Sequence, residues 1–592
     1  MPLVSQIEVV ASSRSGDAYN AHSYHTKVPP AAIARLIERH LPHGGTVGDA
    51  FCGSGTTGVG AAMAEGPGRR YDVVLSDLSP YAAFIARNSN RAPEPEAFER
   101  SARETLDRAR AAVGSLWTTT HDDGRPATVL YVIWSDVLLC PGCGTRFRFW
   151  DVGVDHTVGE VRRELTCECR AVFRKNEALR AIETRADPLL GGLTEQPVRE
   201  PVRIVYEVDG KRFEKEPARD DLARIESARE TAAPDACPRR RMLDVEGPWG
   251  DLHRAGYHAG ITHVHHFYTW RNFITMGHLW EASAATQTPD ACQFLVSSYN
   301  LAHATLMSRI VFKRDSPKPV LTGYQTGTLY ISSLPVEKNP LIGIERSKLP
   351  ALRRGLQVVR GRQGHVDVRT LAAGDWKELD RKVDYVFLDP PFGGNIPYAE
   401  ANFIAEAWIG TTTEQSREAT ISPAQGKTTE DYRDTLAESF SGVRGALSKS
   451  GHMTVMFHSA ADETWRALTG ALSDAGLETD SVLLLDKRQG SFKQVRTSGA
   501  VSGDLLIETR ARRTIKRPRP GSHVAGLGGA TSWLEREMSA QVSQGVDKRR
   551  LFSRYMADCM TGEVATEVAA ADFYAEVERL TEPPIAANRP AA

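Results

Sequence analysis

The stretch Thr46-Val47-Gly48-Asp49-Ala50-Phe51-Cys52-Gly53-Ser54-Gly55-Thr56-Thr57-Gly58 joins a short apolar segment to a glycine-rich turn. The first six residues predict a strand, and the Ala/Val-rich segment that continues to Ala64 predicts a helix. Glycines let the backbone pass close to a ligand at the amino terminus of a helix, where larger side chains would collide. The succession of strand, glycine turn and helix therefore predicts an α/β fold with a ligand at this turn.

A second strand is predicted from Tyr71 to Ser76, and it ends at Asp77, where Leu78-Ser79-Pro80-Tyr81 opens another helix. Nucleotide-binding folds hold ribose hydroxyls with an acid at the end of the second strand, about twenty residues beyond the glycines. Asp77 is therefore predicted to bind a ribose. The alternative role of Asp77 is to cap the following helix, and the two roles are compatible.

The apolar run Val383-Asp384-Tyr385-Val386-Phe387-Leu388 predicts a buried strand that leads straight into Asp389-Pro390-Pro391-Phe392. Consecutive prolines exclude both a helix and a further ladder strand, so the chain leaves the sheet at its carboxyl edge, where open α/β sheets bind their ligands. The Asp389 carboxylate and a proline-fixed carbonyl offer two hydrogen-bond acceptors beside the flat ring of Phe392. This combination suits the exocyclic amine of a base. The alternative is a Pro-Pro loop whose aspartate caps a helix.

The other elements are predicted from periodicity and turn residues. Helical patterns cover residues 31–40, 96–113, 269–285, 290–310, 349–358, 398–408 and 531–580. Strands are predicted over residues 366–371 and 453–458, a hairpin over 199–217 that turns at Asp209-Gly210, and closing antiparallel strands within 479–509. Residues 489–494 are a candidate active-site loop, for which an ordinary hairpin turn is the alternative.

The composition bounds the class of protein. A chain of 592 residues predicts about two to four domains, and 41% hydrophobic with 25% charged residues is ordinary for globular proteins. No apolar run approaches the ~20 residues of a membrane span, and no signal peptide is recognisable, so a cytoplasmic protein without membrane contact is expected. The net charge of -1 says little about nucleic acid. Local basic clusters, each with a solvated surface as its alternative, are Arg239-Arg240-Arg241, residues 510–519 and Lys548-Arg549-Arg550.

Two close pairs of cysteines have the spacing that is typical of metal ligands. Cys140-Pro141-Gly142-Cys143 and Cys167-Glu168-Cys169 frame an aromatic and basic stretch. Two tight pairs predict a four-thiolate zinc ribbon, although the second pair is Cys-x-Cys rather than Cys-x-x-Cys. A closed shell of four thiolates leaves no position for a substrate, so the zinc is expected to be structural. The alternative is buried cysteines that bind no metal.

Histidines crowd one later segment of the chain. They are His253, His258, His263, His265 and His266. A second metal site is one hypothesis. Their irregular spacing and the aromatic run that follows favour the alternative of packing and hydrogen bonding.

The glycine turn and the proline motif together resemble the amino-group methyltransferases, which methylate N6 of adenine or N4 of cytosine with S-adenosylmethionine. Residues 49–57 resemble that family's cofactor motif Asp-x-Phe-x-Gly-x-Gly-Thr-Thr, and residues 389–392 resemble its catalytic motif. With the cysteine pairs, the match over residues 20–92 and 343–509 resembles the adenine-specific DNA methylases that contain a zinc ribbon.

The resemblance implies a Rossmann-like α/β methyltransferase sheet interrupted by an insertion and followed by a helical tail. Residues 1–94 are expected to form the cofactor half of the methyltransferase domain, and residues 343–510 its catalytic half. Residues 95–342 are expected to form the insertion, with a zinc ribbon at about 129–175 and an accessory α+β region for target recognition. Residues 511–592 are expected to form a basic linker and a helical tail.

The resemblance also implies the site residues. The residues expected to bind S-adenosylmethionine are Lys27, Asp49, Phe51, Gly53, Gly55, Thr56, Asp77 and Asp375. The expected catalytic residues are Asp389, Pro390, Pro391 and Phe392. The expected zinc ligands are Cys140, Cys143, Cys167 and Cys169. Lys27 is expected to pair with the cofactor carboxylate, with a plain surface lysine as the alternative. Asp375 is expected beside the adenine ring, with helix capping as the alternative.

The implied reaction is methylation of adenine N6 in double-stranded DNA, because aspartate at the first motif position goes mainly with adenine in this family. The target base would be flipped out of the duplex. Restriction-modification or phage defence, with defence-system partner subunits, is the expected context. One alternative is an RNA methyltransferase acting on guanine N2 or adenine N6, since Asp-Pro-Pro-Phe-Gly also resembles transfer-RNA enzymes. Another is a non-catalytic, zinc-dependent adaptor that binds nucleic acid.

Overall fold

A computed structural model describes residues 9–11, 16–243, 249–313, 319–459, 461–486, 504–511, 527–539, 548–561, 568 and 570–581. The candidate loop at residues 489–494 lies outside these ranges. So do residues 512–519 of the second basic cluster.

An eight-stranded mixed sheet organises the chain, in the order β1-β22-β23-β21-β20-β2-β3-β19. Its strands are β1 (Val9–Ala11), β2 (Gly45–Asp49), β3 (Tyr71–Asp77), β19 (Val366–Thr370), β20 (Val383–Leu388), β21 (Leu447–Phe457), β22 (Leu477–Asp486) and β23 (Asp504–Ala511). β23 runs antiparallel to both of its neighbours, and the other pairings are parallel. The chain order reverses between β2 and β20, a position where open sheets bind ligands.

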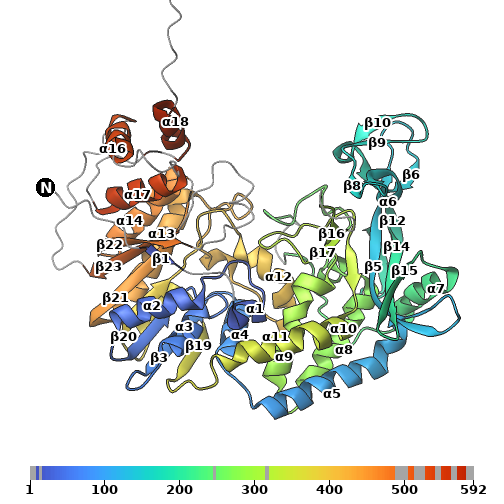
Figure 1. Ribbon diagram of the computed structural model, residues 1–592, viewed down its shortest axis with the longest axis horizontal. Coiled ribbons are helices and arrows are strands. Elements are labelled where there is room, and N and C mark those ends of the chain that lie inside the picture. The colour runs from blue at the N-terminus through green and yellow to red at the C-terminus, as the bar shows by residue number, and fades with distance from the viewer. Residues whose placement is uncertain are drawn as a thin grey trace, which may run out of the picture.

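The inner strands are buried on both faces, which explains their continuous apolar sequences. Tyr385 and Phe387 of β20 pack with α2 (Pro30–His40) on one face. Val386 and Leu388 of the same strand pack on the other face with α13 (Thr429–Ala446) and α14 (Asp462–Asp474). α3 (Thr56–Ala64) follows the glycine turn and lies against α2 (Figure 1). The structure therefore confirms the α/β class.

The segment between β3 and β19 builds a second sheet around the long strand β5 (Pro126–Leu139). β14 (Arg199–Val208) pairs with β5 and continues through a tight turn into β15 (Lys211–Lys215). Asp209 and Gly210 both have positive φ, 49° and 74°, as a two-residue type I′ turn requires. The predicted hairpin is confirmed, whereas β5 was not recognised from the sequence.

The predicted helix at residues 290–310 was too long. α9 (Pro289–Tyr299) gives way to a π-turn at Asn300–Ala304. A short strand, β16 (Arg309–Val311), then follows. α8 (Trp270–Ala284) and α5 (Pro95–Val113) agree with prediction to within a residue at either end.

The insertion shares its hydrophobic core with both halves that flank it. One buried cluster joins insertion helices α5, α8 and α9 to α4 (Pro80–Ser89) before them and to α11 (Leu349–Gln357) and α12 (Tyr398–Ile409) after them. Its members include Ile85, Leu106, Leu279, Leu295, Leu352 and Ile404. Figure 1 shows these helices between the large sheet and the β5 sheet. The segments on either side of the expected boundaries at residues 94 and 343 thus contribute to one buried cluster.

The described part of the predicted helical tail contains α16 (Leu527–Ser539), α17 (Lys548–Thr561) and α18 (Ala570–Thr581). Their apolar side chains, among them Trp533, Phe552 and Phe573, join the same buried cluster as α14 and β22. The tail therefore covers one end of the large sheet (Figure 1). None of the helices in the described part of the chain combines the length and apolar character that a membrane crossing requires.

Candidate functional site

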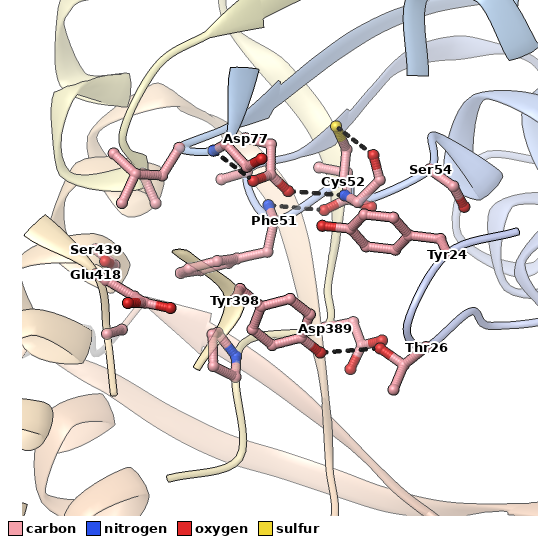
Figure 2. A pocket seen from close by; sticks show the side chains of 18 of the residues that line it. Tyr24, Thr26, Phe51, Cys52, Ser54, Asp77, Asp389, Tyr398, Glu418 and Ser439 are labelled. Carbon is pink, nitrogen blue, oxygen red and sulfur yellow. Dashed lines mark hydrogen bonds between the residues drawn. The ribbon is translucent and has the colours of Figure 1, made fainter. Parts of the chain in front are cut away.

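A pocket lies where β2, β3 and β20 end together at the carboxyl edge of the large sheet. Its lining includes the glycine turn, Asp77 and Ser79, Asp389 and Pro391, and a third group from residues 413–419. In the view of Figure 2, Asp77 lies on one side of the Phe51 ring and Asp389 on the other. The two motifs that the sequence singled out, more than 300 residues apart along the chain, therefore face one cavity.

Asp49 closes the glycine turn. Its Oδ1 accepts a hydrogen bond from the Phe51 amide at 3.0 Å, and its Oδ2 accepts from the Thr57 hydroxyl at 2.5 Å. Burial raises the pKa of Asp49 well above its usual range, and the neighbouring carboxylates of Asp389 and Asp77 add to this effect. Asp49 therefore holds the turn in shape from beneath the cavity.

Asp77 binds the same turn from the end of β3. Its Oδ2 accepts from the Gly53 amide at 2.8 Å, and its Oδ1 accepts from the Ser79 amide at 2.9 Å. Burial raises the pKa of Asp77 to about 6, against the lowering effect of these two bonds. The carboxylate lines the cavity and keeps lone pairs for a ligand's hydroxyl groups.

The two glycines of the turn serve different purposes. Gly53 lines the cavity, with φ of 49°. Gly55, with φ of 77°, faces α4 instead. A Cβ at this position would lie 2.7 Å from the Ala86 Cα and 2.6 Å from the side-chain amide nitrogen of Asn90. Gly55 thus permits close packing of the turn on α4 and does not line the cavity.

Two contacts fix the proline motif, one at Pro391 and one at Phe392. The Pro391 carbonyl accepts a hydrogen bond from the Tyr432 hydroxyl at 2.7 Å. The ring of Phe392 packs edge-on against Phe457, with ring centroids 5.1 Å apart, and is not among the cavity-lining residues. Asp389 is half-buried and lines the cavity.

Tyr398, the first residue of α12, stands opposite the glycine turn. Its hydroxyl is hydrogen-bonded to that of Thr26 at 3.0 Å, and Figure 2 shows Asp389 beside this pair. The ring centroids of Tyr398 and Tyr24 lie 6.4 Å apart, and the two rings are nearly parallel. Aromatic rings therefore border the cavity next to Asp389.

Two cations border the pocket. Arg417 donates to both oxygens of Asp375, at 2.8 and 2.9 Å. Arg417 lines the cavity, whereas Asp375 lies behind it. The Lys27 ammonium donates to the carbonyls of Tyr19 and His22, and burial lowers its pKa to about 7.

The lining has an excess of acidic side chains. Its carboxylates are Asp49, Asp77, Asp389 and Glu418, and its cations are Lys27 and Arg417. Glu418 is buried, which raises its pKa. A bound cation would stabilise the ionised forms of these carboxylates against the effect of burial, so the cavity suits a ligand that carries positive charge.

Most of the expected site residues meet in this cavity. Those that line it are Lys27, Asp49, Phe51, Gly53, Thr56, Asp77, Asp389 and Pro391, and those that do not are Gly55, Asp375, Pro390 and Phe392. Tyr398, Arg417 and Glu418 were not recognised from the sequence. Tyr398 follows the proline motif closely, which is a usable signal, but residues 413–419 carry no motif and reach the site only through folding.

The four cysteines of the two pairs also come together. Cys140 and Cys169 have sulfur atoms 3.8 Å apart, as do Cys143 and Cys167, and all four sulfurs lie within 4.8 Å of one another. A tetrahedral zinc ion with Zn–S bonds of about 2.3 Å places its sulfurs about 3.8 Å apart. The donor set therefore fits zinc in both chemistry and spacing.

The second cysteine pair is one residue shorter than the first, and its turn compensates. Gly144 follows the first pair with φ of 73°, and Arg170 follows the second with φ of 71°. The Gly144 amide bonds to the Cys140 carbonyl, and the Arg170 amide bonds to the Cys167 carbonyl, both at 2.8 Å. Both turns thus end in the left-handed conformation and aim their sulfurs at one point.

A second group of possible metal ligands contains Asp187, His265 and His266. The Nε2 atoms of both histidines lie 2.8 and 2.9 Å from Asp187 Oδ2. The Thr262 amide donates to Nδ1 of His266 at 3.1 Å, which leaves the imidazole proton on Nε2. A protonated nitrogen cannot coordinate a metal, so His266 acts as a hydrogen-bond donor to Asp187.

The other clustered histidines are also bonded within the protein. His253 Nε2 donates to the Ile261 carbonyl at 2.7 Å, and His258 Nε2 donates to the Leu329 carbonyl at 2.9 Å. His263 is hydrogen-bonded to the Thr262 hydroxyl at 2.9 Å. The arrangement supports packing and hydrogen bonding for this segment, rather than a second metal.

Comparison with known proteins adds one finding. The N6/N4 methyltransferase family, described as DNA methylase, matches residues 4–70, which contain α2, β2 and the glycine turn. The resemblance inferred from the motifs is thereby confirmed over this segment. No curated protein matches the chain.

The packing of Gly55 on α4 can be tested by Gly55→Ala, because the new Cβ would lie 2.7 Å from the Ala86 Cα, a backbone atom that cannot yield. We expect a lower thermal unfolding midpoint, with a loss of about 1–3 kcal/mol from the steric conflict. Gly68→Ala is the matched control, since Gly68 has φ of 74° and a Cβ added there would meet nothing within 4 Å. Equal midpoints for the two variants would contradict the packing role.

Proposed function

We propose that the chain is an S-adenosylmethionine-dependent DNA methyltransferase that methylates N6 of adenine. The observation that carries the proposal is the meeting of Asp389 with Asp77 and the glycine turn in one cavity. The match of residues 4–70 to the DNA methylase family supports the same assignment.

The residues present fit the cofactor. The acidic lining suits a sulfonium cation, the Asp77 carboxylate suits ribose hydroxyls, and Gly53 leaves the turn open to the cavity. Lys27 is the lining cation assigned to the methionine carboxylate. Arg417 also lines the cavity and is paired with Asp375, which does not. When bound, S-adenosylmethionine supplies an electrophilic methyl group.

The chain's own part in the reaction is to prepare the amine. The lone pair of the adenine amine is delocalised into the ring, so the nitrogen is a poor nucleophile. Asp389, which lines the cavity, accepts one N–H group of the amine. By resemblance to the family's motif, the second N–H group is assigned to the carbonyl of Pro390, which is not itself a lining residue. The two acceptors draw the nitrogen toward tetrahedral geometry. An Asp389 oxygen is then placed to receive the proton that the amine releases. Positioning and electrostatics supply most of the acceleration.

The substrate in this proposal is a base flipped out of double-stranded DNA, since the amine is paired inside the helix. Tyr24 and Tyr398 supply rings at the cavity wall on which a base can stack. Phe392 supports the motif from behind. A role in restriction-modification or phage defence, together with partner subunits, stays an expectation from the resemblance, and so does the cytoplasmic location.

The proposal extends to the architecture. The large sheet would be a Rossmann-like methyltransferase sheet whose cofactor half and catalytic half are divided by the insertion. Cys140, Cys143, Cys167 and Cys169 would hold one structural zinc ion in a ribbon at the end of β5. The insertion would carry target recognition.

Asp389→Ala should reduce methyl transfer at least about 100-fold, because it removes the acceptor that holds the amine. Binding of S-adenosylhomocysteine, measured by calorimetry, should persist. The assay is transfer of tritiated methyl groups to duplex DNA, with transfer RNA alongside and nucleoside digestion of the product. Asp380→Ala, at the other end of β20 in an exposed position, is the control with expected normal turnover.

The same assay separates the competing functions. N6-methyladenine in DNA supports the proposal, whereas label in transfer RNA favours the RNA enzyme. Normal transfer by Asp389→Ala would contradict the role of this carboxylate. No label in either polymer favours the adaptor.

Asp77 predicts a pH dependence of ligand binding. Its pKa is raised to about 6, so it is mainly ionised at pH 6.5 and mainly protonated at pH 5, while Lys27 with a pKa of about 7 stays mainly charged. If only the ionised carboxylate binds the ribose, affinity for S-adenosylhomocysteine should fall about eightfold over this range. Calorimetry at both pH values measures the change. Asp77→Asn should bind weakly and without this dependence, and a wild-type affinity equal at both pH values would contradict the assignment.

Zinc content gives an independent test of the ribbon. Purified protein should contain one zinc ion per chain by elemental analysis, and Cys167→Ser should lose it and lower the thermal midpoint. Cys559→Ser, which lies outside the cluster, should retain the metal. Zinc-free wild-type protein with an unchanged midpoint would contradict a structural zinc site.

A further inference from the structure

We propose that Asn402 is a positioning residue that aligns the two halves of the methylation site through a directed chain of buried hydrogen bonds. This inference rests on the proposed function and deepens it. Asn402 lies on α12, four residues beyond the cavity-lining Tyr398, and its side chain is inaccessible to solvent.

The chain of bonds begins in the insertion. The amide of Gly327 donates to Nδ1 of His25 at 3.1 Å, so this nitrogen carries a lone pair. Burial lowers the pKa of His25 to about 4, and the ring is therefore neutral with its proton on Nε2. Nε2 donates to the Asn402 carbonyl oxygen at 2.9 Å. This bond fixes which way the Asn402 amide faces.

The amide nitrogen of Asn402 then points at the cofactor half. It lies 3.1 Å from the Ser79 hydroxyl oxygen and 3.4 Å from the Tyr24 hydroxyl oxygen. Both of these residues line the cavity. The Ser79 backbone amide in turn binds the Asp77 carboxylate at 2.9 Å. One side chain on α12 therefore touches two of the groups that shape the Asp77 side of the pocket.

Glu406 ends the chain one turn further along α12. The Ser79 hydroxyl donates to Glu406 Oε1 at 2.6 Å. Thr413, another cavity-lining residue, donates to the same carboxylate through its hydroxyl at 2.5 Å and its amide at 2.8 Å. In this series His25 donates to Asn402, the Asn402 amide donates toward Ser79 and Tyr24, and the hydroxyls of Ser79 and Thr413 donate to Glu406.

The arrangement matters because the halves of the site are separated by the insertion along the chain. Asp389 precedes α12, while Asp77 and Tyr24 belong to the segment before the insertion. Within the site, the Thr26–Tyr398 bond and the Asn402 chain join these segments directly. A displacement of about 1 Å between reacting groups costs on the order of 100-fold in rate. Asn402 is placed to prevent such a displacement.

Asn402→Leu tests the proposal in the full-length protein, since it keeps the side-chain size but removes the amide. We expect kcat for methyl transfer to duplex DNA to fall by on the order of 100-fold. Affinity for S-adenosylhomocysteine should stay near that of the wild type, because the bonds of Asp77 to Gly53 and Ser79 remain. Asn402→Asp keeps the shape and the bond from His25 but lacks both N–H groups, and it provides the same test if the leucine variant does not fold.

Asn272→Leu is the matched control. Asn272 is equally buried, lies on α8, and donates to the Ala304 carbonyl at 2.8 Å away from the cavity. It should lower the thermal midpoint comparably while leaving kcat unchanged. Equal kcat values for the Asn402 and Asn272 variants, or a loss of S-adenosylhomocysteine binding in step with kcat, would overturn the positioning role alone. Wild-type protein that transfers no methyl group would instead contradict the proposed function, and this inference with it.

Discussion

The burial of helix α12 is the constraint on which the rest of the structure depends. Every residue from Ala399 to Trp408 is buried, and a helix enclosed on all sides is expected to be apolar. α12 nevertheless carries Glu400, Asn402 and Glu406. Polar groups in such a place cost several kcal/mol unless they are hydrogen-bonded. All three find hydrogen-bond partners in segments outside α12.

Those partners tie the molecule together. Glu400 accepts from the backbone amides of Asp251 and Leu252 in the insertion, both at 2.8 Å. Asn402 is held by the cofactor half, and Glu406 is held by the cofactor half and by the loop that follows α12. The carboxyl edge of the sheet brings the acidic residues together, and α12 fixes their separation. The pocket is thus a product of sheet topology and of one polar, buried helix.

The sequence predicts the local parts of this site well, because they depend on local physical chemistry. The glycine turn, the acid after the second strand and the strand before Asp389 are contiguous patterns, and so is the hairpin at Asp209-Gly210. The partners of α12 are not contiguous. Contacts such as those between His25 and Gly327, or between Arg417 and Asp375, form only when distant segments pack. Sequence periodicity does not predict such contacts. β5 was missed for a related reason. Its neighbours in sequence, β4 (Thr118–Thr120) and β6 (Arg146–Arg148), are strands of only three residues, and its long partner β14 and the strand at Val336–Lys338 lie far along the chain.

The order of strands in the sheet also determines when it can be completed. β2 pairs early with β3, which follows it closely, but its other neighbour β20 is made only after the insertion. β1 pairs with β22, which lies far along the chain, with Val9 opposite residue 484. Pairing across such separations is slow, and domains generally fold in the order of their synthesis. The insertion is therefore synthesised while the sheet around it is still open, and the pocket cannot be complete until Ser439, the last of its lining residues, has left the ribosome.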